Sequence, residues 1–256
     1  YNELFQLIKE KKNKEFIEKV NKSMFENYTF DINATDFNGK YFVSYAVVTN
    51  NIEIIEFLIG KGARIDVEND DIPILIVTII YSFNEMLELL LKENKKSIGI
   101  GLINYRDKTN KYPIHYAIMK NNMVAIDLLL AYGASVDVYD KDKYNALFYA
   151  VKSRSLEICE KILKFASNIN SKCYTGENAL HIACNFQLYE IAELLIKNGI
   201  NVNVHDITNE ITPLHYCILL NNIKMTILLI ENGANVNLQD IYGNTPLHYS
   251  VIENNH

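Results

Sequence analysis

The sequence predicts an all-α solenoid of stacked helix–turn–helix units joined by β-hairpin finger loops. One six-residue phrase, which opens a short helix, recurs seven times in related forms. Its second residue falls at positions 42, 73, 113, 146, 179, 213 and 246, in steps of 31, 40, 33, 33, 34 and 33. A second apolar helical segment follows the phrase in the first six units. A period of about 33 residues is typical of a repeat array in which each unit contacts only its neighbours.

Before the first repeat, residues 1–30 predict two helices, over Glu3–Ile8 and Lys14–Met24, whose outer face is rich in Lys and Glu. A polar face of this kind suits a capping unit that seals one end of a stack. The repeat array is predicted over residues 31–256, as six full repeats and a partial seventh. Because the sequence reaches His256 without a second helix in the seventh unit, we expect the chain to be a fragment of a longer protein.

The unit from Asn203 to Asn235 illustrates how one repeat forms. Thr212 is well suited to cap a helix, and Pro213 fits its first position, where a missing N–H costs nothing. A second helix is predicted from about Lys224 to Glu231. Gly233 is expected to end it in the left-handed conformation. An extended finger then leads into the next unit.

Departures from this pattern predict local irregularities. The second unit has a finger about two residues short, at Glu68–Asp71, and it has Leu75 where four other units have a histidine. An insertion of about seven residues near Lys95–Gly101 is expected in a loop before the third finger. Asn94 and Ala166 replace the glycine that ends the second helix elsewhere. Alanine tolerates the left-handed region poorly, so the loop after the fourth unit is expected to be distorted.

The segment Asp240–Tyr249, which reads Asp-Ile-Tyr-Gly-Asn-Thr-Pro-Leu-His-Tyr, closely resembles the repeating phrase of the ankyrin repeat family. The resemblance extends from about Asp36 to the end of the chain. It implies an ankyrin-repeat solenoid and a role in protein–protein interaction rather than catalysis. It also implies that a partner lies in the concave groove formed by the finger tips and the exposed face of each first helix.

The recurring histidines His115, His181, His215 and His248 could suggest a metal site. However, each lies on a different repeat, about 10 Å from the next, whereas zinc ligands lie about 2 Å from the metal. The family resemblance implies instead that this histidine makes hydrogen bonds that tie repeats together. His181 and Cys184 lie three residues apart, but nothing near them supplies an orienting group and a pocket. We therefore predict no catalytic residue, no metal, no cofactor and no enzymatic activity.

Asparagines also recur before the fingers. They are Asn33, Asn104, Asn170, Asn203 and Asn237. Since asparagine readily bonds its own backbone, we expect these residues to serve turn geometry.

The composition restricts the class of partner and the compartment. A net charge of −6 argues against a general nucleic-acid binder, and binding through a lysine patch would require a steep salt dependence. The apolar runs are shorter than the roughly 20 residues that span a bilayer, so we predict no membrane insertion. The cysteines show no metal-binding spacing, which suggests a reduced, cytoplasmic protein. We also expect a monomer. Cys173 stands in a loop and is expected to be the exposed thiol, whereas Cys159, Cys184 and Cys217 are expected to be buried.

The groove positions of the family give a stripe that is basic in units three and four and apolar or aromatic in units five to seven. The candidate partner-binding residues are Lys108, Lys111, Met119, Lys120, Lys141, Tyr144, Lys152, Tyr174, Phe186, Ile207, Leu219, Leu220, Ile241 and Tyr242. Contiguous apolar residues in solvent-facing positions mark interaction sites, and tyrosine is frequent in binding hot spots. The alternative is that the lysines reflect an AT-rich genome and that Leu219 and Leu220 pack on further repeats.

The sequence thus predicts a non-catalytic scaffold that binds a protein segment in the concave groove. That segment is expected to be acidic over units three and four and to place apolar anchors over units five to seven. The alternative is a substrate-recruiting or regulatory ankyrin arm of a larger enzyme, ion channel or pathogen effector.

Overall fold

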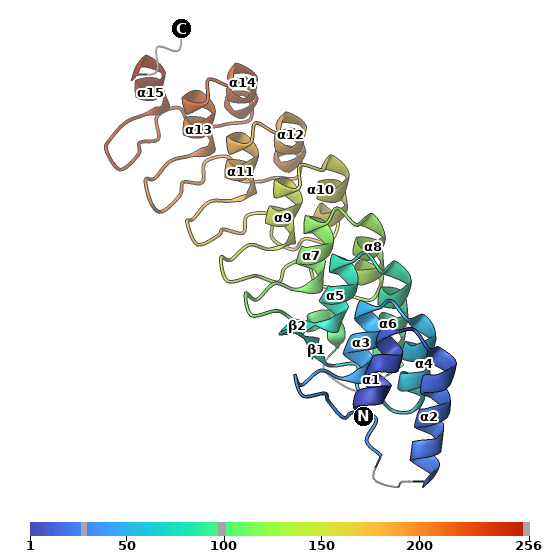
Figure 1. The fold of residues 1–256 in the computed structure, drawn as a ribbon. Helices are drawn as coiled ribbons and strands as arrows, with labels where there is room; N and C mark the ends of the chain where they lie inside the picture. The colour runs from blue at the N-terminus through green and yellow to red at the C-terminus, as the bar shows by residue number, and fades with distance from the viewer. Residues whose placement is uncertain (27–29, 97–100, 253–256) are drawn as a thin grey trace. The chain divides into compact units, whose positions relative to one another are not determined.

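The computed structural model describes residues 1–26, 30–96 and 101–252, and it confirms the predicted class of stacked helix pairs. The chain divides into two compact units, Tyr1–Ala134 (unit 1) and Ser135–His256 (unit 2). Within each unit, short first helices lie between the finger loops and the second helices (Figure 1). The division into a capping segment and a repeat array stays a prediction.

Unit 1 begins with a helix pair and continues with three repeats. Its elements are α1 (Asn2–Lys9), α2 (Asn13–Glu26), α3 (Phe42–Val48), α4 (Ile52–Gly60), β1 (Glu68–Asn69), β2 (Ile72–Pro73), α5 (Ile74–Ile80), α6 (Asn84–Lys96), the 3₁₀ helix η1 (Leu102–Asn104), α7 (Pro113–Met119) and α8 (Met123–Ala131). The largest buried side chains of the opening pair include Ile8 and Phe16, and Phe16 packs edge-on against Phe42 of the first repeat.

Unit 2 contains the remaining repeats. Its elements are α9 (Ala146–Lys152), α10 (Leu156–Leu163), α11 (Ala179–Asn185), α12 (Tyr189–Lys197), α13 (Pro213–Leu219), α14 (Ile223–Glu231) and α15 (Pro246–Ile252). The residues at the centre of each phrase form the core, as Leu180, Ala183 and Cys184 do on α11, where each is at most 1% exposed. The recurring phrase therefore becomes a row of first helices packed side by side.

The phrase itself starts each first helix. At α13, the backbone N–H of Thr212 donates to Nδ1 of His215 at 3.2 Å, and the Thr212 hydroxyl lies 2.8 Å from the same atom. Pro213 occupies the first helical position, as predicted. The threonine and the histidine thus fix the start of the helix together.

The second helices end mostly on glycine. Gly62, Gly133, Gly199 and Gly233 have φ between +83° and +89°, as the sequence predicts. Helix α10 has no such residue, and the N–H groups of Phe165 and Ala166 both donate to Ile162 O at 3.0 Å. The loop after the fourth repeat therefore closes differently from the others, because Ala166 stays outside the left-handed region.

The finger of the second repeat is a tight hairpin. Strands β1 and β2 pair antiparallel, with Glu68 opposite Pro73 and Asn69 opposite Ile72. The two turn residues, Asp70 and Asp71, have φ of +51° and +63°, which is the geometry of a two-residue hairpin turn. The missing residues of this finger thus produce a shorter projection than in the neighbouring repeats.

The structure corrects the expectation for the second helix of this repeat. Asn94 does not end the helix but lies inside α6, and its Oδ1 accepts a hydrogen bond from the N–H of Leu102 at 3.0 Å. The predicted loop insertion at 95–101 therefore begins with two helical residues. Residues 97–100 lie outside the described part of the chain.

The expectation for the recurring asparagines is also wrong for three of them. Their side chains bond the backbone of the next repeat instead of their own turn. The pairs are Asn33 Oδ1 with the N–H of Arg64 (2.8 Å), Asn170 Oδ1 with Asn201 (2.7 Å) and Asn203 Oδ1 with Asn235 (2.7 Å). The turns are instead closed by the residue two positions earlier, for example by Asn201 Oδ1, which accepts from the N–H of Asn203 at 2.9 Å.

The turn between the paired helices uses a left-handed residue that is not glycine. Among the described residues these are Asn50, Ser82, Asn121, Arg154, Gln187 and Asn221. A side chain with a Cβ costs about 1–2 kcal/mol in this region, and asparagine tolerates it best.

We therefore expect Gln187→Gly to raise the free energy of unfolding by about 0.5–1 kcal/mol, since relief of this strain exceeds the added entropy of glycine in the unfolded chain. Gln187 is exposed and has a φ of +57°. Urea denaturation followed by circular dichroism measures the change. Asn221→Gly is the matched control and should gain less, so equal gains at both positions would contradict the strain argument.

Candidate functional site

The recurring histidines are structural hydrogen-bonding groups. In His181, Nδ1 accepts from the N–H of Asn178 at 3.2 Å, and Nε2 donates to Ile211 O of the next repeat at 3.2 Å. His215 repeats the arrangement, with Nε2 3.3 Å from Asn244 O. Burial lowers the pKa of His181 to about 4, so its ring is neutral near pH 7. These bonds agree with the role that the family resemblance implied.

A pair formed by an aspartate and a tyrosine fixes most of the fingers. The two partners lie nine positions apart in the sequence, and the tyrosine hydroxyl donates to the carboxylate of the finger in its own repeat. The pairs are Tyr45 with Asp36 (2.5 Å), Tyr116 with Asp107 (2.6 Å), Tyr149 with Asp140 (2.5 Å) and Tyr249 with Asp240 (2.6 Å). The other carboxylate oxygen accepts two finger N–H groups, as Asp140 Oδ1 does from Asp142 and Tyr144, both at 2.9 Å. Each finger is therefore held rigidly to its first helix.

Two repeats depart from this pairing in ways that the sequence makes visible. The fifth repeat has Cys173 in place of the aspartate and Ile182 in place of the tyrosine, so both partners change together. The sixth has a finger one residue longer, and Tyr216 donates to Glu177 of the preceding finger at 3.3 Å. The nine-residue spacing of Asp and Tyr was the signal that could have revealed the pair from the sequence.

The predicted groove residues of unit 1 are Lys108, Lys111, Met119 and Lys120. Lys108 Nζ forms an ion pair with Asp71 Oδ2 at 2.6 Å. Lys111 Nζ donates to a nearby threonine hydroxyl at 3.0 Å, whereas Met119 is 50% exposed and Lys120 is exposed. The charge of Lys108 is thus neutralised by its own chain.

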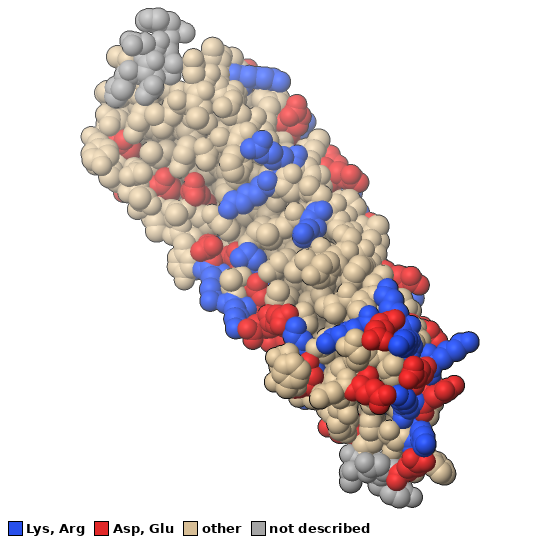
Figure 2. Space-filling view, in the orientation of Figure 1, with Lys and Arg blue, Asp and Glu red and all other residues tan. Residues whose placement is uncertain are grey.

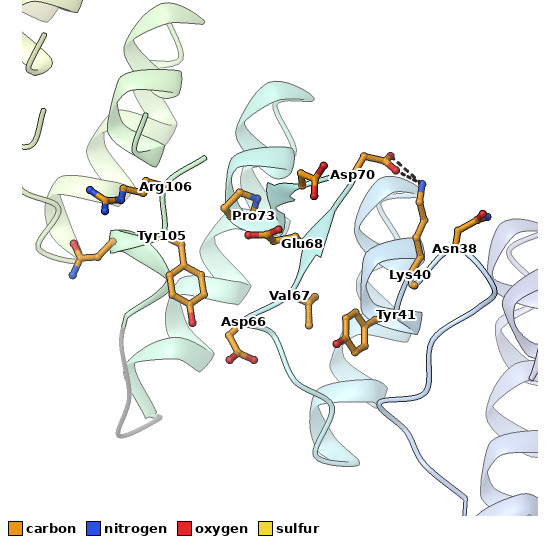
Figure 3. A pocket seen from close by; sticks show the side chains of 13 residues that line it. Asn38, Lys40, Tyr41, Asp66, Val67, Glu68, Asp70, Pro73, Tyr105 and Arg106 are labelled. Atoms are coloured by element: carbon orange, nitrogen blue, oxygen red, sulfur yellow. Dashed lines mark hydrogen bonds and ion pairs between the residues drawn. The ribbon is translucent and has the colours of Figure 1, made fainter. Parts of the chain in front are cut away.

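Unit 1 also contains a hollow of about 730 Å³ between the fingers of its first and third repeats (Figure 3). It exists because the hairpin of β1 and β2 between them is short. Tyr41 and Tyr105 line it, together with the carboxylates of Asp66 and Glu68. The sequence predicted the short finger but not the hollow that it leaves.

The carboxylates of this hollow are largely neutralised by the chain itself. Lys40 Nζ lies 2.9 Å from Asp70, as the dashed line in Figure 3 marks. Arg64 holds Asp66 through two bonds of 2.9 and 3.0 Å, and this contact keeps the pKa of the carboxyl below its usual range. The hollow therefore offers a charged ligand little net attraction.

Unit 2 brings four of its predicted residues into one row along the fingers, called here the finger row. Its members follow the first residue of consecutive fingers: Lys141, Tyr174, Ile207 and Ile241. The last three are 60%, 69% and 48% exposed, and Tyr242 beside them is 77% exposed. Backbone hydrogen bonds join the fingers, from the N–H of Ile207 to Thr175 O (2.7 Å) and from that of Ile241 to Asn209 O (3.0 Å). The last three members of the row thus form an exposed apolar surface on a rigid support.

One glycine makes this close approach of fingers possible. Gly176 has a φ of +82°, and a Cβ at this position would lie 2.7 Å from a side-chain carbon of Ile207 and 2.8 Å from its backbone nitrogen. A residue with a side chain would therefore push the next finger away.

A second row, called here the helix row, follows the ends of the first helices. It consists of Lys152, the last residue of α9, and of Phe186 and Leu220, which directly follow α11 and α13 and are each 37% exposed. Leu219 is half-buried beside Leu220. Two rows of the predicted stripe therefore border the exposed face of the first helices.

Three cations near the fourth repeat lie over aromatic rings instead of beside carboxylates. Lys152 Nζ is 3.6 Å from the centre of the Tyr144 ring, Lys143 Nζ is 5.0 Å from that of Tyr174, and Arg154 lies 5.1 Å from that of Phe186. Among the described residues, none of these three cations forms an ion pair. Such contacts contribute about 0.5–1 kcal/mol at exposed sites and leave the positive charge available to an anionic partner.

The electrostatics of this cluster follow from partial burial. Burial raises the pKa of Tyr144 to about 12 and lowers the pKa of Lys152. Lys143 and Arg154 have φ of +59° and +60°, so both cations stand on backbone that disfavours a side chain. Lys143 and Arg154 were absent from the predicted partner-binding residues, although Arg154 lies close to the groove positions of the fourth repeat in the sequence.

Apolar side chains are also exposed on α15, outside both rows. Leu247 is 70% exposed, whereas its equivalent in the preceding repeat, Leu214, is 1% exposed because α15 packs against α13. A hollow of about 290 Å³ next to Leu247 includes Ile230 and Val236. The stacking pattern of the repeats accounts for this surface without any partner.

The cysteines do not form a reactive site. Cys173 is 5% exposed, so the expectation of an exposed thiol is wrong. Its Sγ lies 3.0 Å from the Thr175 hydroxyl inside the finger. Burial raises the pKa of Cys159 to about 12 and that of Cys184 as well, the latter helped by contact with Cys217. Thiols held in the neutral form are poor nucleophiles.

Two further searches cover the described residues only. They contain no group of three or more His, Cys, Asp or Glu side chains placed to hold a metal ion. Within the same ranges, every helix is too short or too polar to cross a membrane.

Comparisons with known proteins agree with the repeat architecture. A family model described as "Ankyrin repeats (3 copies)" matches residues 84–173, 114–206 and 180–256, which together span more than half of the chain. The chain is similar to the ankyrin repeat domain of Bcl-3, described as a unique member of the IkappaB protein family. The TM-score is 0.65 at 26% sequence identity, and the match covers 72% of this chain and 81% of that structure.

Curated relatives come from viruses and animals. The chain is 37% identical over 146 residues to the putative ankyrin repeat protein L371 of Acanthamoeba polyphaga mimivirus, which covers 57% of this chain and 19% of that protein. It is 29% identical over 126 residues to the human transient receptor potential cation channel subfamily A member 1, and the match covers 48% of this chain and 11% of that protein. It is 28% identical over 122 residues to the putative palmitoyltransferase ZDHHC13 of Danio rerio, and the match covers 46% of this chain and 18% of that protein. The chain thus spans less than a fifth of the length of each of these relatives.

Proposed function

The chain belongs to the ankyrin repeat family, whose repeats mediate protein–protein interaction, and from this premise we propose that it is a non-catalytic scaffold. Its partner is a protein segment that binds in the concave groove of unit 2, between the finger row and the helix row. The segment carries acidic residues near the fourth repeat and apolar residues over the fifth to seventh.

The observation that carries this proposal is the finger row itself. Four consecutive fingers present Lys141, Tyr174, Ile207 and Ile241 from equivalent positions on a hydrogen-bonded support. Isolated exposed apolar residues are ordinary on protein surfaces, but an aligned series of them marks an interaction site. Apolar anchors would supply most of the affinity, and the cations would orient the partner and accelerate its association.

A pull-down from cell extract with matched variants tests the proposal. The groove variant carries Lys141→Glu, Ile207→Asp and Tyr242→Asp, and the control variant carries Lys164→Glu, Leu156→Asp and Ile227→Asp on the second helices or at their ends. Both sets change charge equally at exposed positions. We expect the unmodified chain and the control variant to capture a common protein that the groove variant loses. Capture by both variants would place the interaction outside the groove.

A second candidate rests on the lengths of the relatives. The animal relatives include a cation channel and a putative palmitoyltransferase, of which this chain spans 11% and 18%. We propose as the alternative that the array serves as a recruiting or regulatory arm of a longer protein. Reading the gene beyond codon 256 distinguishes the candidates, since a catalytic or channel segment would support the arm and a stop codon would exclude it on that side.

A further inference from the structure

The spacing of the finger row limits which kind of segment can occupy the groove. Backbone hydrogen bonds attach Ile207 and Ile241 directly to the preceding fingers, so the three apolar side chains of the row recur at a fixed interval. That interval equals the separation of the packed first helices, which is about 8–10 Å for helices in contact. A partner must therefore present its anchors on one face at this interval.

The width of the groove adds a second condition. The finger row precedes each first helix by five or six residues and the helix row lies at or next to its end, so at least the seven residues of α11 or α13 separate the two rows. Seven residues of α-helix rise about 10.5 Å, which is close to the diameter of about 10–12 Å of a helix with its side chains. A single extended strand is too narrow to contact Tyr174 and Phe186 at once.

Among the regular backbone conformations only the α-helix meets both conditions. A polyproline II segment repeats one face every three residues, at about 9.3 Å, but it is a single extended chain and fails the condition of width. In a β-strand, side chains on one face recur every two residues, at about 6.6 or 13.2 Å, and neither multiple matches the interval. In an α-helix, residues seven apart lie on nearly the same face and about 10.5 Å apart. One heptad of a helix therefore corresponds to one repeat of this groove.

The cations at the fourth repeat determine the direction in which the helix lies along the groove. At the fourth repeat the two rows consist of Lys141 and Lys152, flanked by Lys143 and Arg154, and none of the four forms an ion pair among the described residues. At the fifth and sixth repeats the same two rows are Tyr174 with Phe186 and Ile207 with Leu220. The matching helix thus carries one acidic heptad followed by heptads with apolar pairs.

We infer that the groove of unit 2 binds an amphipathic α-helix of about three or four heptads, acidic over the fourth repeat and apolar over the fifth to seventh. This inference rests on the proposed function and specifies its partner. The Lys143, Lys152 and Arg154 side chains, already fixed over aromatic rings, receive the carboxylates of the acidic heptad. Ile207 and Leu220 contact the apolar residues at positions a and d of the heptads that follow.

Three synthetic peptides test the spacing and the helix, and the first two have identical composition. The heptad peptide has 28 residues, an acidic first heptad, and leucines at positions a and d of the other three. In the second peptide the leucine pairs recur every six residues instead of every seven, which disperses the leucines around the helix. The third has the sequence of the heptad peptide with a central proline in two heptads, which prevents a continuous helix. Fluorescence anisotropy with the full chain gives each dissociation constant, and circular dichroism gives the helix content on binding.

We expect the heptad peptide to bind at least about tenfold more tightly than the other two and to gain helix on binding. Ile207→Asp should weaken its binding about tenfold or more, whereas Ile227→Asp, at a residue of similar exposure on α14, should not. Equal binding of all peptides, or none by the heptad peptide, would overturn the inference. If the pull-down still shows partner loss with the groove variant, the proposed function stands and only the helix is wrong. If the pull-down also fails, the groove itself is wrong.

Discussion

Asp140→Ala is expected to lower the free energy of unfolding by about 3 kcal/mol or more, the largest effect of any single substitution considered for this chain. Asp140 is 5% exposed. Its carboxylate accepts hydrogen bonds from the N–H groups of Asp142 and Tyr144 at 2.9 Å and from the Tyr149 hydroxyl at 2.5 Å. Removing the carboxylate leaves three donors without an acceptor at a partly buried site, and each unsatisfied donor costs about 1 kcal/mol or more. Urea denaturation measures the change.

Two further variants separate the lost bonds from a general effect of substitution in the finger. Asp142→Ala removes an exposed carboxylate two residues away and should change stability by less than about 0.5 kcal/mol. Tyr149→Phe removes one of the three bonds and should cost about 1–2 kcal/mol. If Asp140→Ala were no worse than Asp142→Ala, the aspartate would not anchor the finger.

Stability is expected to fall by about 3 kcal/mol as the pH decreases from 6.5 to 4, before most carboxylates titrate. Burial holds the pKa of His181 at about 4 in the folded chain, against 6.5 for an unperturbed histidine. The folded state therefore keeps the neutral ring, and its full stability is present above pH 6.5. Below that pH the unfolded chain binds the proton first, so the free energy of unfolding declines until the pH passes the folded pKa. Burial lowers the pKa of His215 in the same direction and adds to the loss.

The carboxylates titrate in a different window. Burial raises the pKa of Asp107 and Asp240, but the tyrosine hydroxyl and the finger backbone outweigh it, so the pKa of each carboxyl lies below 3.8. Their contribution is lost only at more acidic pH. Urea denaturation at half-unit intervals from pH 7 to 4 should show a flatter dependence for His181→Gln. His205→Gln is the control at an exposed histidine, and equal slopes for all three proteins would contradict the argument.

Much of the fold could be predicted because its signals are local. The phrase contains its own cap, and Gly62 or Gly233 marks the end of a second helix by a backbone conformation that side chains disfavour. Ala166 predicted an unusual closure for the same reason. Asn94 misled because asparagine tolerates both conformations, and tertiary contacts with Leu102 decide between them.

Less of the candidate site could be predicted, because its properties depend on contacts between repeats. The sequence placed Lys108 and Lys152 in the same class, yet one is paired with Asp71 and the other lies over Tyr144. The ring contacts of Lys143 and Arg154 carry no signal in the sequence, since only the stacking of the next repeat brings a ring beneath them. Cys173 was expected to be exposed because it lies in a loop, but the rigid finger buries loop residues too.

The asparagine bonds between repeats bear on how the chain acquires its structure. The loop N–H of Asn201 is bonded by Asn170 one repeat earlier, and the N–H of Asn235 by Asn203. Each new loop therefore finds its hydrogen-bond acceptor on the preceding repeat, once that repeat has formed. An isolated repeat lacks that template, so folding within a unit should proceed by nucleation and outward growth, with the terminal repeats opening first under mechanical force.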